Sequence, residues 1–262
     1  MKPTILIAVI TLASCAALRA SEPPKGEPTN GAEAAAQEAA AKKSKPNAEG
    51  EKAQDVSSLL RQLNQVQEDG RWNEAEEILA ELLSLEPKLK DDLQATSITI
   101  LLNRSLEQKK WDAAEKHLDE LIQIEPQAQT ALLAVRIQIL VEKGEMNKAC
   151  LLARNALESD KDRCSLNAVA HALIGNSERL KEEVAKLAHE IALAANEGEL
   201  LCDCRAGHLS VLARIEFLQG RRSEAAETAR RALRLTDDPE MKRRIQADLD
   251  SYRSGKLPTS TK

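Results

Sequence analysis

A short phrase ending in alanine recurs four times along the chain and constrains its fold more than any other feature. The copies read Gly70-Arg71-Trp72-Asn73-Glu74-Ala75, Trp111-Asp112-Ala113-Ala114, Gly144-Glu145-Met146-Asn147-Lys148-Ala149 and Gly220-Arg221-Arg222-Ser223-Glu224-Ala225. Aligned on their alanines, the first three copies lie 39 and 35 residues apart, and the interval of 76 residues before the last copy is about twice a single repeat. A period in the thirties, with each copy between two apolar helical patterns, predicts stacked helix pairs. Such arrays bind through extended surfaces, so the repeat favours a binding function over chemistry.

The amino-acid composition favours helices packed through small and aliphatic side chains. Of the 262 residues, 42% are hydrophobic but only 2% are aromatic, and Ala, Leu, Glu and Lys are abundant. These residue types have high helix propensity, so we expect an all-α chain. The formal net charge of −5 lacks the basic surplus that a broad phosphate-binding surface needs, so no nucleic-acid partner is expected.

The sequence from residue 53 to about residue 237 resembles tetratricopeptide repeats. This family has a small residue at the hairpin turn, an aromatic two positions later, alanine three further on, and small or apolar residues four and seven beyond that. The matching residues of the four copies are Gly70, Trp72, Ala75, Leu79 and Leu82; Trp111, Ala114, Leu118 and Leu121; Gly144, Met146, Ala149, Ala153 and Ala156; and Gly220, Arg222, Ala225, Ala229 and Ala232. Lys109 stands where the second copy would have glycine. We expect Trp72 and Trp111 to pack in the core.

The resemblance implies a right-handed superhelical array of about five antiparallel helix pairs within residues 53–255. The wide gap between the third and last copies must hold a fourth pair. Its first helix is expected over 166–173, and its second, unusually long, over 178–196. Gly198 would end this second helix.

Polar sequence follows the last copy. A charged helix from Pro239 to about Arg253 would form the solvent-facing cap that a repeat array needs. Residues 256–262 are expected to form a disordered tail.

Residues on the first helix of each pair supply the candidate binding surface, because this helix lines the concave face in the family that the repeats resemble. Counting back from the aligned alanines gives the candidate groove residues Asn64, Thr99, Asn103, Gln138 and Arg214. Asn64, Asn103 and Gln138 share one repeat position, since each stands equally far before the alanine of its own copy. A row of carboxamides can donate to and accept from an extended peptide backbone. The alternative, equally open, is that these side chains only cover a solvated face.

One specialisation of the family is not expected here. Its chaperone-binding members hold a terminal carboxylate with cationic side chains, but the corresponding positions carry Leu60, Ala134 and Gln138. We therefore predict a protein or peptide partner of another kind.

The N-terminal segment, residues 1–20, resembles a bacterial secretory signal. Lys2 precedes an apolar run too short to span a membrane comfortably, and small residues follow. The sequence Leu12-Ala13-Ser14-Cys15 matches a lipobox, in which the cysteine is acylated and becomes the new N-terminus. Cleavage after Ala17 or Ala20 without lipidation, and retention of the segment as a helix, are the alternatives.

Residues 21–52 are expected to form a disordered tether. Their prolines, glycines and mixed Ala, Glu and Lys run offer little apolar surface to bury. Together with the signal, they predict an exported protein of the periplasm or of the periplasmic face of the outer membrane. A lipid would attach it to the membrane if Cys15 is acylated.

The cysteines beyond Cys15 are Cys150, Cys164, Cys202 and Cys204, an even number that suits an oxidising compartment. Cys164 and the Cys202-Asp203-Cys204 segment begin the first helices of consecutive pairs, so a disulfide between them is geometrically feasible. The alternatives are a metal site with His208, and His171 as a further ligand, or inert packing of small buried thiols.

Motifs for catalysis are absent from the sequence. The chain has four histidines, no Gly-rich phosphate loop, no nucleophile elbow and no His-Glu-x-x-His. We expect a non-catalytic scaffold, with no cofactor, that recruits a protein or peptide to the cell envelope. Its layout is similar to that of repeat-bearing bacterial lipoproteins that serve as protease adaptors or in outer-membrane barrel assembly. The alternative is a thiol-active or metal-binding envelope accessory protein that uses Cys164, Cys202 and Cys204.

Overall fold

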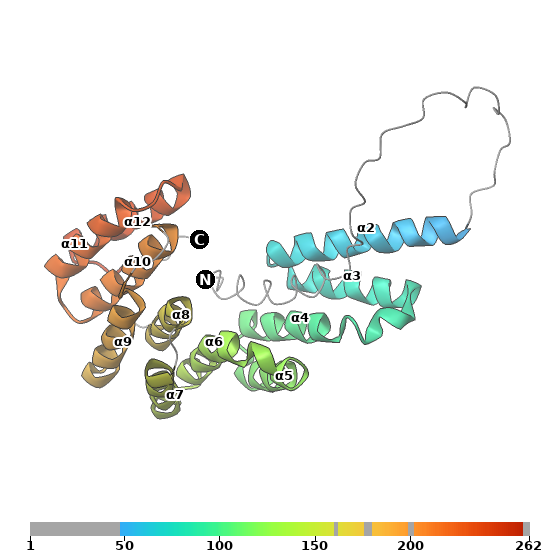
Figure 1. The fold of residues 1–262 in the computed structure, drawn as a ribbon, viewed down its shortest axis with the longest axis horizontal. Coiled ribbons are helices and arrows are strands. Elements are labelled where there is room, and N and C mark those ends of the chain that lie inside the picture. Colours follow the sequence, from blue (N-terminus) through green and yellow to red (C-terminus); the bar gives the residue numbers. More distant parts are fainter. Residues whose placement is uncertain (1–47, 160–161, 176–179, 199–201, 259–262) are drawn as a thin grey trace, which may run out of the picture. The chain divides into compact units, whose positions relative to one another are not determined.

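The computed structural model describes residues 48–159, 162–175, 180–198 and 202–258. Within these ranges the chain forms α-helices and short 3₁₀ turns and no strand (Figure 1). The helices are α2 (Ala48–Glu68), α3 (Trp72–Leu85), α4 (Gln94–Glu107), α5 (Trp111–Ile124), α6 (Gln129–Glu142), α7 (Met146–Ser159), α8 (Arg163–Ile174), α9 (Glu182–Ala195), α10 (Cys202–Leu218), α11 (Arg222–Leu233) and α12 (Pro239–Ser254), with 3₁₀ turns at Pro87–Lys90 and Pro126–Ala128. The all-α prediction and the helical-repeat arrangement are confirmed.

Several sequence predictions fall outside the described residues. The signal segment, the lipobox with Cys15, and residues 21–47 of the expected tether lie there, as does the end of the expected tail from residue 259. Helix α2 begins at Ala48, a few residues before the expected start of the repeat domain. Among the described helices, none is both long enough and apolar enough to cross a membrane.

The described chain forms two compact units that divide between Arg104 and Ser105, within the last turn of α4. The N-terminal unit holds α2, α3 and most of α4. Its core includes Leu63, Trp72 and Leu82, each at most 2% exposed. The prediction that Trp72 packs in the core is therefore confirmed, whereas Trp111, in the other unit, is half-buried.

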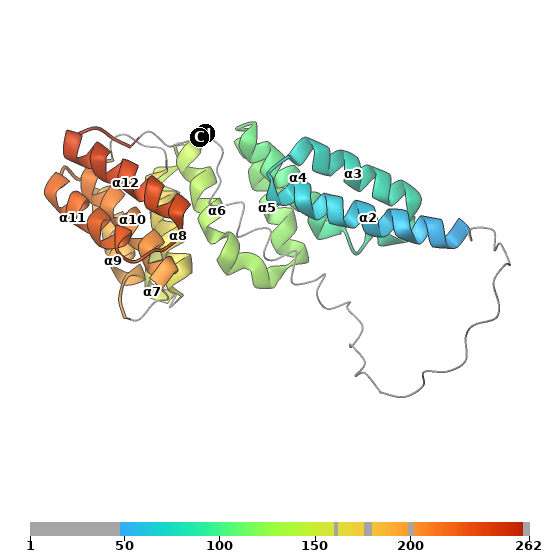
Figure 2. The same ribbon diagram turned by 90° about the horizontal axis from the view of Figure 1, so that it is seen from above.

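The C-terminal unit stacks its helix pairs on one another. Contacts join α6 to α8 and α8 to α10, the first helices of consecutive pairs, and join α7 to α9, which are second helices. Within the pairs, α8 packs on α9 and α10 on α11, and α12 lies against α11 (Figure 2). The unit is thus a layer of first helices beside a layer of second helices, the arrangement expected of a repeat array.

Four of the turns between paired helices share one backbone geometry. The turn residue has a positive φ in each case, namely 68° at Gly70, 55° at Lys109, 78° at Gly144 and 81° at Gly220. In each turn, the N–H of this residue donates to the carbonyl three residues back, and the next N–H donates to the carbonyl five residues before it. Glycine adopts this conformation without steric cost, so Lys109 occupies a glycine position under strain.

The aligned alanines lie at the contact between helices. Ala75, Ala114, Ala149 and Ala225 are each 0% exposed. The residues four and seven positions further along are buried as well, namely Leu79 and Leu82, Leu118 and Leu121, Ala153 and Ala156, and Ala229 and Ala232. The small side chain lets two helix backbones approach closely, as the repeat pattern predicts.

One ion pair recurs between the second helix of a pair and the first helix of the next pair. Glu76 of α3 pairs with Arg104 of α4. One repeat later, Glu115 of α5 pairs with Lys143 at the end of α6, at 2.7 Å, and Lys143 also contacts Asp112 at 2.8 Å. The repeat therefore extends beyond the apolar positions to a charged contact between pairs.

The fourth pair differs from the prediction in its second helix. Helix α9 begins at Glu182 rather than at residue 178, and its 14 residues match the length of α3, α5 and α7. Lys181, just before it, has extended backbone angles (φ −63°, ψ 144°), which exclude an earlier start of this helix. Ala188, Ala192 and Ala195 keep the spacing of four and seven residues and are each 0% exposed.

The predicted charged C-terminal helix is confirmed as α12. Asp238 caps its N-terminus by accepting a hydrogen bond of 2.9 Å from the Glu240 N–H, and Gly255 ends it with φ 72°. Its buried face carries Ile245, Leu249 and Tyr252. Most of its other side chains are charged or polar, as expected of a capping helix.

Candidate functional site

The five candidate groove residues fall into two environments. Thr99 and Asn103 of α4 are buried, at 3% and 2% exposed, and Asn103 Nδ2 donates a hydrogen bond of 2.9 Å to the Thr99 carbonyl. Both side chains are therefore closed to a ligand in this structure and act as polar groups of the interior. Asn64, Gln138 and Arg214 are half-buried and reach the surface.

Asn64 and Gln138 keep their hydrogen-bonding capacity free. Within the described residues, neither side-chain amide has a hydrogen-bond partner, so each can offer two donors and an acceptor to a ligand. Asn64 belongs to the N-terminal unit and Gln138 to the C-terminal unit. A role in binding therefore stays a prediction, made for Asn64 in the N-terminal unit and for Gln138 in the C-terminal unit.

Arg214 occupies the same repeat position as the carboxamides, because it stands equally far before the aligned alanine of its copy, Ala225. Its Nη2 donates one long hydrogen bond, 3.4 Å, to the Gly175 carbonyl at the end of α8. Its Nε atom is buried and finds no partner in the described part of the chain, where Arg214 also forms no ion pair. A guanidinium has five N–H donors, so most of the donors of Arg214 remain unused.

Ionisable side chains from three helices surround Arg214, and we call His171, Arg214, Arg244 and Asp248 the Arg214 cluster. They come from α8, α10 and α12. Burial, followed by the positive charges of Arg214 and Arg244, lowers the pKa of His171 to about 4. Burial raises the pKa of Asp248, against the opposing effect of Arg244 and Arg214. The cluster therefore holds a neutral imidazole beside two cations at neutral pH.

Aromatic packing next to the Arg214 cluster supports its position. Tyr252 is 1% exposed, and its ring centroid lies 5.0 Å from that of Phe217. Glu216, 7% exposed, has its pKa raised chiefly by burial, while a hydrogen bond with Thr228 acts in the opposite direction. This packing fixes α10 against α11 and α12, which gives Arg214 a rigid base.

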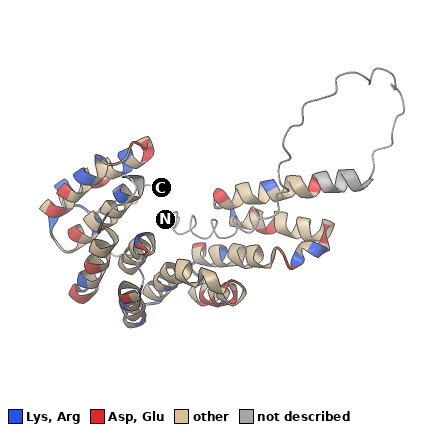
Figure 3. Cartoon of the chain, in the orientation of Figure 1, with Lys and Arg blue, Asp and Glu red and all other residues tan. Residues whose placement is uncertain are grey.

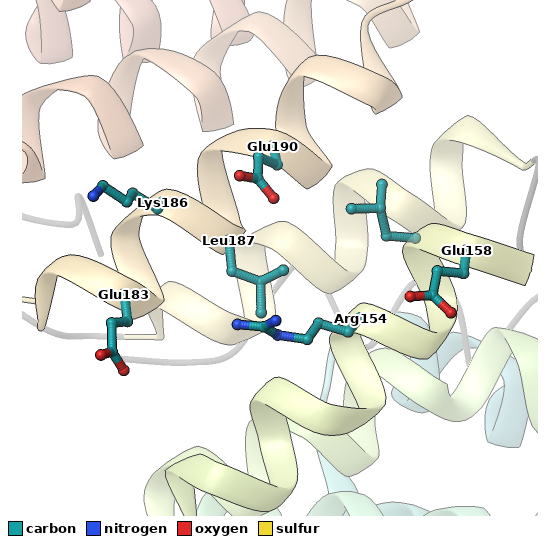
Figure 4. A pocket seen from close by; sticks show the side chains of 7 residues that line it. Arg154, Glu158, Glu183, Lys186, Leu187 and Glu190 are labelled. Carbon is teal, nitrogen blue, oxygen red and sulfur yellow. The ribbon is translucent and has the colours of Figure 1, made fainter.

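A shallow hollow of about 320 Å³ lies between the second helices α7 and α9 (Figure 4). Its lining residues are Arg154, Leu157, Glu158, Glu183, Lys186, Leu187 and Glu190. Figure 4 shows the Arg154 side chain extending toward Leu187, with acidic side chains at the rim. Charges of both signs surround a small apolar floor, so the hollow has no marked preference for one kind of ligand. More generally, acidic and basic residues are interspersed along the described helices (Figure 3).

The structure brings two of the predicted cysteines together. Cys164 and Cys204 are exposed free cysteines, and Cys204 lies near enough to Cys164 to help raise the pKa of its thiol. The side chain of Cys202 lies outside the described residues. His208 is 4% exposed, and its Nδ1 contacts the Ala195 carbonyl at 3.1 Å. No three His, Cys, Asp or Glu side chains of the described chain gather closely enough to hold a metal ion.

Sequence reasoning named Arg214 as a groove residue and His171 only as a ligand of the alternative metal site, and it missed Arg244 and Asp248. His171, Arg244 and Asp248 lie on helices far apart in the sequence, and none of them belongs to the repeated phrase. One signal was nevertheless present. Arg244, Asp248 and Tyr252 follow one another at intervals of four, which places them on one face of their helix.

The helical-repeat arrangement is seen directly in the structure, whereas the resemblance to tetratricopeptide repeats rests on the motifs of the sequence alone. Comparisons of the chain with protein-family models, with curated proteins and with solved structures return no match.

Proposed function

We propose that this chain is a non-catalytic, tetratricopeptide-like scaffold of the bacterial cell envelope that binds an extended segment of a partner protein. In this proposal the chain is exported, and Cys15 carries a lipid that holds it at the periplasmic face of the outer membrane. Within each unit the first helices of the pairs supply a binding surface, because they carry Asn64 in the N-terminal unit and Gln138 and Arg214 in the C-terminal unit.

The observation that carries the proposal is the unused hydrogen-bonding capacity of Arg214. Its buried Nε has no partner in the described structure, and its one hydrogen bond, to the Gly175 carbonyl, is 3.4 Å long. A partly desolvated guanidinium whose donors lack acceptors is unfavourable, and a ligand that supplies acceptor oxygens would relieve this cost. The site therefore suits a carboxylate side chain or backbone carbonyls of a bound segment.

The neighbours of Arg214 favour the same kind of ligand. Arg244 adds a second positive charge, and neutral His171 adds a hydrogen-bonding group that carries no charge near pH 7. The carboxyl group of Asp248 limits the net charge of the cluster and disfavours a highly charged ligand such as a polyphosphate. An acidic residue within an otherwise uncharged segment fits these conditions.

A quantitative pull-down from detergent-solubilised envelopes tests the proposal. We expect Arg214→Ala to lower the recovery of at least one partner about tenfold, because a charge-assisted hydrogen bond is lost. Arg243→Ala is the matched control, since Arg243 is an exposed arginine of α12 without an ion pair in the described structure. If wild type, Arg214→Ala and Arg243→Ala recover every partner equally, the proposed binding surface is wrong.

The anchor has a separate test. Metabolic labelling with a fatty-acid probe should mark the wild-type chain, while Cys15→Ser should remove the label. A labelled Cys15→Ser chain, or an unlabelled wild type of normal abundance, would contradict lipidation at Cys15 without affecting the binding proposal.

A further inference from the structure

Two exposed thiols meet where the first helices of the fourth and fifth pairs begin. Cys164 lies in the first turn of α8 and Cys204 in the first turn of α10. These two helices pack against each other, and the Cys204 side chain lies near enough to Cys164 to help raise the pKa of its thiol. A disulfide between two helices requires cysteines on neighbouring backbone segments, and the adjacent starts of α8 and α10 meet this condition.

The start of α8 is fixed by a side-chain cap. Asp162 accepts hydrogen bonds from the Ser165 N–H at 2.9 Å and from the Ser165 hydroxyl at 2.6 Å, and a weaker one of 3.4 Å from the Cys164 N–H. These bonds hold the backbone of Cys164 in place. Its thiol therefore has a defined position on the surface.

The start of α10 is fixed against the same region. His208, one turn after Cys204, is buried and contacts the Ala195 carbonyl at the end of α9. Gly198, in the connection that follows α9, lies close against the side chain of Arg163 in α8. A Cβ added at Gly198 would be only 3.0 Å from Nη1 of Arg163. Anchored backbone therefore carries both cysteines.

We propose that Cys164 and Cys204 form an intramolecular disulfide that joins α8 to α10 when the chain meets a disulfide oxidant. The inference is independent of the binding surface proposed above. It selects Cys204 over Cys202 and leaves the half-buried Cys150 of α7 as a free thiol. The bond would be structural, and it would fix the stack of first helices that carries Arg214.

The oxidation proceeds by two thiol–disulfide exchanges with a disulfide such as oxidised glutathione. The thiolate of one cysteine attacks the disulfide, which forms a mixed disulfide and releases one glutathione thiolate. The second cysteine, as thiolate, then attacks the mixed disulfide and releases the second glutathione. Overall the two cysteines lose two protons and two electrons, and these reduce one glutathione disulfide to two thiols.

The environment of Cys164 favours a structural bond over a reactive thiol. Burial, followed by the charge of Asp162 and the contact with Cys204, raises the pKa of the Cys164 thiol. Catalytic and redox-sensing cysteines instead have a lowered pKa, because the thiolate is the nucleophile. This argues against the thiol-active alternative and suits a disulfide that forms slowly and then persists.

The test uses the purified full-length chain, equilibrated with oxidised glutathione and then analysed for free thiols and intact mass. Wild type, Cys150→Ser and Cys202→Ser should each contain one intramolecular disulfide, which takes up two protein thiols and lowers the mass by about 2 Da, while every other cysteine that reacts adds the mass of one glutathione. Cys164→Ser and Cys204→Ser should not form this bond, and the remaining partner should carry a glutathione instead. Oxidised wild type should melt about 5–10 °C above its reduced form, with no such difference in Cys204→Ser.

Two results would overturn the inference. If Cys202→Ser prevents the bond and Cys204→Ser does not, the disulfide joins Cys164 to Cys202 instead. If Cys164 and Cys204 of the wild type remain free or are glutathionylated separately at equilibrium, the disulfide between them does not form. Circular dichroism of the serine variants, together with Cys164→Ala as a second substitution, separates these results from a loss of folding.

Discussion

Asn103 Nδ2 donates a hydrogen bond of 2.9 Å to the main-chain carbonyl of Thr99, one helical turn earlier, and both side chains are closed off from solvent. The carboxamide is therefore used within its own helix. Asn64, at the same repeat position in α2, remains half-buried and without a hydrogen bond in the described structure. Equivalent positions of a repeat thus carry the same residue in two different roles, one internal and one available for binding.

Asn103→Ala and Asn64→Ala should differ in their effect on stability. The first removes a buried hydrogen-bonded group, so we expect the free energy of unfolding to fall by about 1–2 kcal/mol. The second should change it by less than about 0.5 kcal/mol, because Asn64 has no partner to lose. Urea unfolding followed by circular dichroism measures both. Equal losses would show that the two amides have the same structural role.

The strained turn at Lys109 allows a paired exchange with Gly144, whose φ is also positive. Gly144→Lys should lower the free energy of unfolding by about 1 kcal/mol, since a Cβ at positive φ is strained; no atom lies within 4 Å to add a clash. Lys109→Gly should raise it by less than about 1 kcal/mol, because relief of strain is offset by the flexibility of glycine in the unfolded chain. The melting temperatures of the two variants should therefore shift in opposite directions from that of the wild type. A shift of the same sign in both variants would contradict the equivalence of the turns.

The repeated phrase predicted those parts of the fold that depend on local sequence. It located the buried alanines and the turn residues, including the unusual Lys109, because helix contacts and left-handed turns require particular residue types at fixed spacing. The fourth pair was harder, since its turn lacks the phrase, and the buried series from Ala188 to Ala195 was hidden within a uniformly alanine-rich helix. Only the packing of α9 distinguishes the buried alanines from their neighbours.

The candidate site was less predictable for a physical reason. Whether Asn103 faces solvent depends on the tertiary packing around α4, and the assembly of His171, Arg214 and Asp248 depends on how three helices stack. Sequence spacing describes one helix at a time, so it names residues on a face but not what lies opposite them. The Cys164 and Cys204 contact was anticipated only as one of several pairings.

Ala188→Leu tests the alignment of the fourth pair with the others. Ala188 is 0% exposed, so three added carbon atoms must displace neighbouring helices, and we expect a loss of about 1–3 kcal/mol in the free energy of unfolding. Leu193→Ala, on the same helix, is the control: Leu193 is 45% exposed, and its truncation should cost less than about 1 kcal/mol. Chemical denaturation compares the two. A larger loss at Leu193 would place the helix contact on the other face of α9.

His171 should make the stability of the C-terminal unit sensitive to mild acid. Its pKa is about 4 in the folded chain against an ordinary value of 6.5, so the unfolded chain binds the proton more readily. The stabilising contribution is therefore complete above pH 6.5 and is lost as the pH falls from 6.5 toward 4. Between these values we expect the free energy of unfolding to fall by about 1–3 kcal/mol more in the wild type than in His171→Gln.

The cations beside His171 supply a second arm of this pH experiment. Arg244→Ala should reduce the pH dependence, because one of the two positive charges that repel protonated His171 is gone. Urea unfolding at closely spaced pH values provides the measurement for wild type and both variants. Parallel pH profiles for wild type and His171→Gln would show that His171 titrates alike in the folded and unfolded chains, and would contradict its placement in a desolvated, positively charged cluster.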